Sequence, residues 1–376
     1  MKTPLAWLNL LYDKMRTAVA IAGVTFALIL ILMQLGFYGS VLQSATRVYD
    51  RLRFDLLVVS PQYMFFSKSG TFPKPRLYQV QGNPAVESAS PLYLGVHLWR
   101  NLDTGRRRGM LIMGVDPADG VFDLPEIEAN VEKLNVPDNV LVDRLSRSEF
   151  GPRDVGLSTE IGGHTIRVVG HFTLGTGFGA DGAILTSDRT FARILPFRSS
   201  QQVSLGLVRL KSGSNPDEVA RELRERLPPD VRVMTRAEVR AHEQHHWVVK
   251  TSVGIIFGLG VVVAVLVGTA IVYQVLSSDI ANRLPEYATL KAMGYGPRYL
   301  SSVVLQQAWI LAVAGFLPSF LISVALYGMT ERLANIPMNM TTPRAVGVLL
   351  TSVAMCSISA MLSLRKVNTA DPADLF

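Results

Sequence analysis

Four long stretches without Asp, Glu, Lys, Arg or His constrain this chain more than any other feature of its sequence. They run over 18–37, 251–276, 299–329 and 345–364. About 20 consecutive apolar residues are enough for a helix to span the hydrocarbon core of a bilayer. We therefore expect a membrane protein with four spanning helices, a class that also accounts for the 49% of apolar residues in the whole chain.

Between the first two stretches lies a large insert, 38–250, that contains most of the charged residues. A segment of this length can bury a core of its own. The chain has one cysteine, Cys356, inside the last apolar stretch, so no disulfide within the chain holds the insert together. The net charge of +7 belongs to a mixed surface and to residues that flank the spans, which argues against nucleic acid as a partner.

The distribution of Lys and Arg predicts the orientation. The segments 1–17, 277–298 and 365–376 together carry eight of them, whereas 330–344 carries two. Because short cytoplasmic loops collect Lys and Arg, we expect a multi-pass inner-membrane protein with both termini in the cytoplasm and the insert outside. The first stretch is predicted to be an uncleaved anchor, since the apolar core of a signal peptide is shorter.

The expected fold class is an α-helical membrane protein with four transmembrane helices and a large α+β extracytoplasmic domain on a helical stalk. The predicted segments are a cytoplasmic amphipathic helix 1–17, a span 18–37, a stalk helix 38–53, a periplasmic domain 54–234, a second stalk helix 235–250, a span 251–276, a cytoplasmic loop 277–298, a span 299–329, a short periplasmic loop 330–344, a span 345–364 and a cytoplasmic tail 365–376. Within the periplasmic domain, 54–99 and 204–234 are predicted to form βαβ-like pieces and 100–203 a β-rich part.

Local signals locate elements within the insert. The first stalk helix has an apolar stripe formed by Val41, Leu42, Ala45 and Val48. Thr235 and Glu238 match a capping box, from which a helix without proline is expected to run into the second span. Other predicted elements are strands at 54–60, 90–99, 183–186, 204–211 and 231–234, helices at 76–81 and 215–227, and a hairpin of 157–161 with 165–169 around Gly162-Gly163.

Two short motifs formally match enzyme signatures. His242, Glu243 and His246 fit H-E-x-x-H, which on a helix can bind zinc with the glutamate as base. No third ligand is evident, so a solvated His/Trp cluster at the membrane interface is favoured. The segment 177–182 fits G-x-G-x-x-G, but a strand is expected after it, which favours a loop over a dinucleotide site. A P-loop motif is absent from the sequence.

The spans contain no Asp, Glu, Lys, Arg or His, whereas ion-coupled transporters and pumps need ionisable groups inside the membrane. Charge-free spans suit helices that anchor a domain and move as rods. The most polar members of the spans are Gln34, Gln306 and Gln307, and we expect them to form hydrogen bonds between helices.

The loop 277–298 contains a short predicted helix with an apolar side. Its signals are a proline in the first turn, an acid near the start, a base near the end and a glycine cap, here Pro285, Glu286, Lys291 and Gly294. The apolar side is formed by Tyr287, Leu290 and Met293. Such a helix is either a docking surface for a partner or an amphipathic helix lying on the lipid.

Arg283 with the following segment 286–294 resembles the coupling-helix motif of MacB/FtsX/LolC-type ABC permeases. Residues 6–17 and 370–373 resemble this family too, and the likeness covers the whole chain, most of all to the DevC-type branch of cyanobacterial envelope exporters. The resemblance implies a homodimer that works with a cytoplasmic ABC ATPase, a periplasmic adaptor (membrane-fusion) protein and a TolC-like outer-membrane channel. It implies no cofactor in this chain, because ATP and Mg²⁺ bind to the ATPase.

The function implied by the resemblance is that of a non-catalytic permease subunit. It would transmit ATP-driven motion to the periplasmic domain for export of an amphiphile such as a glycolipid. Two alternatives remain open at this point. One is an FtsX-like regulator of cell-wall hydrolases, and the other is a membrane metallopeptidase that uses the H-E-x-x-H residues.

Overall fold

The computed structural model describes residues 7, 12, 14–175, 179–198, 200–282, 286, 289, 293, 296–334 and 336–369. The chain divides at Ser40/Val41 and at Thr251/Ser252 into two compact units. We call 41–251 the sheet unit and the rest the helical unit. Most of the predicted amphipathic helix 1–17 and the end of the chain from 370 lie outside the described residues.

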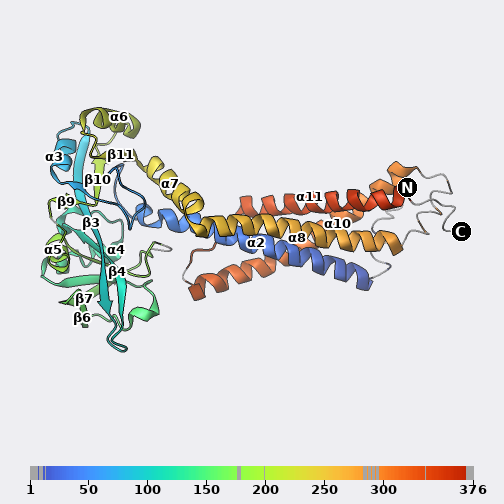
Figure 1. Ribbon diagram of the computed structural model, residues 1–376, viewed down its shortest axis with the longest axis horizontal. Coiled ribbons are helices and arrows are strands. Elements are labelled where there is room, and N and C mark those ends of the chain that lie inside the picture. The colour runs from blue at the N-terminus through green and yellow to red at the C-terminus, as the bar shows by residue number, and fades with distance from the viewer. Residues whose placement is uncertain are drawn as a thin grey trace. The chain divides into compact units, whose positions relative to one another are not determined.

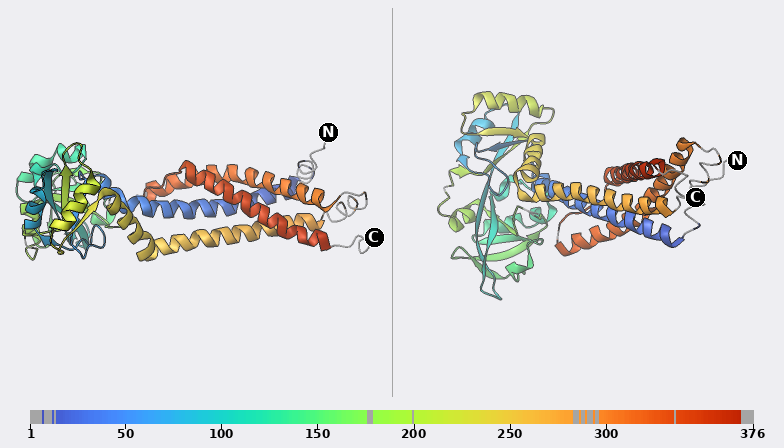
Figure 2. Two further views of the ribbon diagram at one scale, coloured as in Figure 1. Left: turned by 90° about the horizontal axis from the view of Figure 1, so that it is seen from above. Right: turned by 45° about the vertical axis from the view of Figure 1, so that its right-hand side comes forward.

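The helical unit is built from long apolar helices that run alongside one another (Figures 1 and 2). They are α2 (Lys14–Asp50), which continues past Ser40 into the sheet unit, α8 (Ser252–Asn282), α10 (Pro297–Ala334) and α11 (Thr342–Thr369). Among the described residues, these four helices are long and apolar enough to cross a membrane, which confirms the four predicted spans.

Small residues bring these helices close together. A Cβ at Gly315 of α10 would lie 2.6 Å from the Val24 side chain of α2. Thr25 Oγ1 donates a hydrogen bond to the Gly315 carbonyl oxygen at 3.2 Å, and Ser359 Oγ donates one to the Thr269 carbonyl oxygen at 3.1 Å. Close backbone approach and such polar bonds stabilise helix packing in lipid, where the hydrophobic effect gives no preference for helix over lipid contacts.

The prediction that the glutamines of the spans form hydrogen bonds between helices is wrong for one side-chain atom of Gln34 and one of Gln307. Gln34 Oε1 and Gln307 Nε2 are buried and have no hydrogen-bond partner among the described residues. Gln34 instead packs against Gly260, where an added Cβ would lie 2.5 Å from Oε1. The described interhelical bonds come from shorter side chains and aromatic ones, such as Trp309 Nε1, which donates to Ser357 Oγ at 2.9 Å.

The sheet unit contains a nine-stranded mixed sheet within its described residues (Figure 1). The strand order is β11-β1-β10-β3-β4-β8-β5-β7-β6. The strands are β1 (Leu56–Val59), β3 (Val86–Arg100), β4 (Arg107–Val115), β5 (Asn139–Asp143), β6 (Ser158–Ile161), β7 (His164–Phe172), β8 (Ala183–Ser187), β10 (Leu205–Leu210) and β11 (Arg232–Thr235), with β2 (Phe72–Pro73) and β9 (Gln202–Val203) in a separate pair. The helices are α3 (Pro75–Gln81), α4 (Pro125–Glu128), α5 (Asp188–Ile194), α6 (Pro216–Arg226) and α7 (Arg236–His245).

The long strand β3 joins the two ends of the insert to its middle. Its first part, up to Leu92, pairs antiparallel with β10, and its second part, from Tyr93, pairs antiparallel with β4. The expected α+β extracytoplasmic domain is therefore present, as one continuous sheet that runs from β11 to β6.

Both faces of the sheet are covered. In β1, Leu56 and Val58 belong to the core on the face of α3, α5 and α6, whereas Leu57 and Val59 belong to the core on the face of α4 and α7. Because successive side chains of a strand point to opposite faces, a strand covered on both sides is apolar throughout. This explains why β1 shows a continuous apolar run instead of alternation.

The local turn and cap signals of the sequence are confirmed. Gly162 and Gly163 connect β6 to β7 with φ of 58° and 87°, as a two-residue hairpin turn with positive φ at both positions requires. Asn215 caps α6 by accepting a hydrogen bond from the Asp217 amide, and Ser187 caps α5 in the same way.

The expectation of one helix from Thr235 into the second span is wrong. α7 ends at His245, the next turn (His246–Lys250) has π-helical bonding, and Thr251 is extended with φ −107° and ψ 151°. The break falls at the boundary between the sheet unit and the helical unit. Thr251 Oγ1 donates to the Trp247 carbonyl oxygen at 2.6 Å and so satisfies one group at the break.

Candidate functional site

Three side chains on one face of α7 hold the end of α2 inside the sheet unit. Arg236, Arg240 and Glu243 are spaced so that they lie one above the other along the helix. Each of them contacts Tyr49, Asp50 or the residues just beyond them. We call this set of contacts, which also includes Tyr63, the α2–α7 junction.

Arg236 binds carbonyl groups at the end of α2 and in the segment that follows it. Its guanidinium donates to the carbonyl oxygens of Tyr49 at 3.4 Å, Leu52 at 2.6 Å and Phe54 at 3.1 Å. The last carbonyls of a helix have no partner within the helix and form the negative end of its dipole, so a cation is favourable there. The guanidinium carbon also lies 4.4 Å from the centre of the Phe54 ring, a cation–π contact.

Arg240 adds a weaker contact. Its guanidinium donates to Asp50 Oδ1 at 2.6 Å, and both side chains are about half exposed. A solvent-exposed ion pair of this kind contributes less than about 1 kcal/mol, so Arg240 orients α7 more than it stabilises the unit.

Glu243 is the buried member of the junction, with a relative exposure of 1%. Tyr49 Oη donates to its Oε1 at 3.0 Å, Tyr63 Oη donates to the same oxygen, and the two hydroxyls are in contact with each other. Oε2 has no hydrogen-bond partner among the described residues. Burial therefore raises the pKa of Glu243 from its ordinary value to about 7, against the tyrosine hydroxyls, which favour the charged form.

Tyr63 responds to the same environment. Burial, followed by the nearby Glu243 carboxyl, raises the pKa of the Tyr63 hydroxyl well above its ordinary value, so it remains a donor throughout the physiological range. Tyr49 also makes an edge contact with Phe66, at 5.5 Å between ring centres, which fixes its position. The junction is thus a hydrogen-bonded polar centre within an apolar core.

The H-E-x-x-H residues are not arranged for zinc chemistry. His242 Nε2 lies 3.1 Å from the Met64 carbonyl oxygen, His246 stacks on Phe65 with 4.9 Å between ring centres, and Glu243 faces the tyrosines. Within the part of the chain that the structure describes, no group of three His, Cys, Asp or Glu side chains could hold a metal ion. His242, His246 and Trp247 of the favoured His/Trp cluster are partly exposed, whereas Glu243 between them is buried in the core.

The glycine motif at 177–182 is described from Gly179 onward. Gly182 leads directly into β8, and the next helix, α5, begins only at Asp188. A Cβ at Gly182 would lie 2.7 Å from the Phe150 ring, so this glycine is needed for packing. No helix begins within the described part of the motif, 179–182, which agrees with the predicted loop.

The predicted stalk residues are placed as follows. Val41, Ala45 and Val48 are buried along α2 and Leu42 is partly exposed. Thr235 and Glu238 form the predicted capping box, in which Thr235 Oγ1 accepts from the Glu238 amide and Glu238 Oε2 accepts from the Thr235 amide. Their role as a stalk stays a prediction.

Only part of the predicted coupling helix is described. Glu286 and Thr289 are helical, and Met293 is exposed in a turn, where its amide donates to the Thr289 carbonyl oxygen at 3.0 Å. The other predicted residues of this surface, which lie outside the described residues, are Arg283, Pro285, Tyr287, Leu290, Lys291 and Gly294. Their docking role stays a prediction.

Substituting Thr235 with alanine is expected to destabilise the sheet unit by about 1 kcal/mol, because the first turn of α7 then loses its side-chain acceptor. Thermal unfolding of the full-length protein should show a midpoint about 2 to 4 °C lower. The exposed Thr165 of β7 provides the control, since Thr165→Ala removes no cap. Equal midpoints for the two variants would contradict a stabilising cap.

The fold defines a class of protein in which a large mixed-sheet unit is inserted after the first of several apolar helices that are long enough to span a membrane. Residues 17–226 match the family model of the MacB-like periplasmic core domain, and residues 258–372 match that of the FtsX-like permease C-terminal region. The chain therefore belongs to the MacB/FtsX family of ABC transporter permeases. It is an inner-membrane permease subunit of a family that works with an ABC ATPase.

Two solved structures show the extent of the likeness. The periplasmic region of MacB from Actinobacillus actinomycetemcomitans is 9% identical, with a TM-score of 0.38 over 52% of this chain and 94% of that chain. The extracellular domain of the noncanonic ABC-type transporter YknZ from Gram-positive bacteria is 13% identical, with a TM-score of 0.34 over 48% of this chain and 99% of that chain. No curated protein matches the chain.

Proposed function

We propose that this permease transmits the motion of a separate cytoplasmic ATPase to its periplasmic domain and thereby drives export of a glycolipid-like amphiphile. The ATPase binds ATP and Mg²⁺ and docks on the loop 277–298, while this chain performs no catalysis. Both termini lie in the cytoplasm, and the chain works as a homodimer. A periplasmic adaptor and a TolC-like outer-membrane channel complete the export path, as in the DevC-type permeases that the sequence resembles.

The observation that carries this proposal is the α2–α7 junction. α2 is a single helix of 37 residues that contains the first span, and Arg236, Arg240 and Glu243 each contact Tyr49 or Asp50 in its last turn. A continuous helix whose end is fixed by several bonds transmits a displacement as a rigid body. The spans support the same conclusion, because they contain no Asp, Glu, Lys, Arg or His for ion coupling.

Exchanging two residues of the cytoplasmic loop tests where the ATPase docks. The variant Glu286→Lys with Leu290→Asp reverses the charge at the start of the helix and places a carboxylate on its apolar side. We expect the ATPase to be lost when the variant is purified by affinity in mild detergent, with the amounts of both chains measured from the same sample. An apolar contact that receives a charge is strongly disfavoured.

The matched control makes the same exchanges in the other short connection between spans. Glu331→Lys with Leu333→Asp alters two exposed residues near the end of α10, and the ATPase should then co-purify at its normal ratio. Protease protection of the sheet unit verifies that both variants insert and fold. Normal co-purification with the loop variant, or loss with both, would show that the ATPase does not dock on 277–298.

A further inference from the structure

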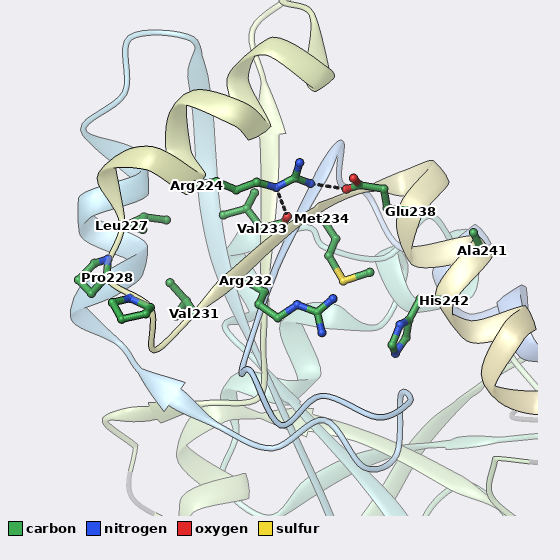
Figure 3. A pocket seen from close by; sticks show the side chains of 11 residues that line it. Arg224, Leu227, Pro228, Val231, Arg232, Val233, Met234, Glu238, Ala241 and His242 are labelled. Carbon is green, nitrogen blue, oxygen red and sulfur yellow. Dashed lines mark hydrogen bonds and ion pairs between the residues drawn. The ribbon is translucent and has the colours of Figure 1, made fainter. Parts of the chain in front are cut away.

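A cavity of about 600 Å³ opens between the end of α6, the edge strand β11 and α7. Figure 3 shows its lining, in which Leu227 and Pro228 lie opposite Ala241 and His242, and Met234 lies between them. Its volume falls in the range of small-molecule sites, which are mostly apolar with a few converging polar groups. This cavity has no part in the α2–α7 junction.

Arg232 is the unusual member of the lining. Its side chain extends from β11 toward His242 (Figure 3), and its guanidinium has no hydrogen-bond or ion-pair partner within the described residues. Its neighbour Arg224, by contrast, donates to the Val233 carbonyl oxygen at 2.8 Å and pairs with Glu238. With the Arg224–Glu238 pair neutral as a whole, the cavity keeps one uncompensated positive charge beside apolar side chains.

The exposed edge of β11 excludes one kind of occupant. A peptide that adds to a sheet edge needs the free amide and carbonyl groups of that edge. Here Arg224 occupies the Val233 carbonyl oxygen, and Glu238 Oε2 accepts from the Thr235 amide at 2.8 Å. The remaining recognition groups are a guanidinium and an apolar wall, which fit a molecule with an acidic head and an aliphatic body.

We propose that this cavity binds an anionic amphiphile, with a carboxylate or phosphate head on Arg232 and its aliphatic part against Leu227, Pro228 and Met234. A guanidinium binds such heads through two parallel hydrogen bonds. The site stands whether or not its ligand is the exported cargo.

Photolabelling of the full-length protein in lipid nanodiscs tests this site. The probe is lauric acid with a diazirine on its chain, and the neutral control is the methyl ester of the same probe. We expect the acid to label the segment 227–242 saturably, as found by mass spectrometry of the peptides. Arg232→Gln should lower this labelling about tenfold, because a charge-assisted pair is lost, and the ester should label the segment at a similarly low level.

The matched control is Arg167→Gln on β7, which removes another exposed arginine with no partner among the described residues. This variant should be labelled as the wild type is. Equal labelling by acid and ester, labelling confined to the spanning helices, or an equal loss in both variants would overturn the proposal. So would a photoreactive residue at Leu227 that captures a partner protein in preference to the acid, because the cavity would then be a protein-docking site.

Discussion

Replacing Arg236 with alanine is expected to lower the free energy of unfolding of the sheet unit by about 3 kcal/mol. The variant loses charge-assisted hydrogen bonds to the carbonyl oxygens of Tyr49, Leu52 and Phe54, worth about 1.5 to 3 kcal/mol. It also loses the cation–π contact with Phe54, worth about 1 kcal/mol. For a unit of this size the midpoint of thermal unfolding should fall by about 6 to 12 °C. The fluorescence of the buried Trp99 reports this transition in the full-length protein.

Arg209→Ala is the control for this prediction. Arg209 is a strand arginine whose only described ion pair, with Glu87, is exposed and 3.7 Å long, so its loss should change the midpoint little. If the junction transmits motion, Arg236→Ala should also reduce export at temperatures where the sheet unit is still folded, while the ATPase co-purifies normally. A midpoint within about 2 °C of the wild type would mean that Arg236 does not hold the end of α2.

Glu243→Gln is expected to remove a pH dependence of stability of about 3 kcal/mol. Burial raises the pKa of Glu243 from 4.5 to about 7 in the folded state, so between these values the folded protein keeps a proton that the unfolded chain has released. Stability from this group is therefore complete below pH 4.5 and is lost as the pH rises toward and past 7. A difference of about 2.5 pKa units corresponds to about 3 kcal/mol.

Glutamine keeps the Oε1 acceptor for Tyr49 and Tyr63 but cannot ionise, so the variant should be the more stable protein at pH 8. The measurement is the unfolding midpoint at a series of pH values for both proteins. Burial also raises the pKa of Asp143, and Asp143 contributes equally to both curves. The difference between the two curves therefore reports Glu243 alone. Glu225→Gln, at an exposed position on α6, should give the wild-type curve. Parallel curves for Glu243→Gln and wild type would refute a raised pKa at this residue.

A second variant examines the cause of the shift. The Tyr63 hydroxyl donates to Glu243 and favours the charged carboxylate, so Tyr63→Phe should raise the pKa of Glu243 further. The decline of stability with pH would then move to higher pH. A decline that moves to lower pH would show that Tyr63 does not stabilise the charged form.

Elements that depend on local rules could be predicted from the sequence. The hairpin at Gly162-Gly163 follows from the need for positive φ, the start of α6 from Asn215-Pro216, and the cap of α7 from Thr235 and Glu238. The break before Thr251 has no such local signal. No proline lies there, and the same bond from a threonine to the carbonyl oxygen four residues earlier occurs inside the unbroken helices α8, α10 and α11.

The candidate site depends on contacts that are far apart along the chain. The spacing of Arg236, Arg240 and Glu243 on one face of α7 was visible in the sequence, but nothing local identifies their partners. The H-E-x-x-H pattern offers Glu243 only as the base of a metal site, and the structure places it against two tyrosines instead.

The sequence by itself determined the four spans and the inserted domain, because hydropathy is a property of neighbouring residues. Its short motifs also indicated a likeness to MacB/FtsX permeases, which agrees with the family models. Only the tertiary structure decided that the end of α2 is bound by α7 and that one carboxyl group is buried there. Tyr49 and Glu243 are 194 residues apart, and their pairing exists only once the sheet brings α2 and α7 to the same face. The pKa of Glu243 depends on that burial, which no local pattern contains.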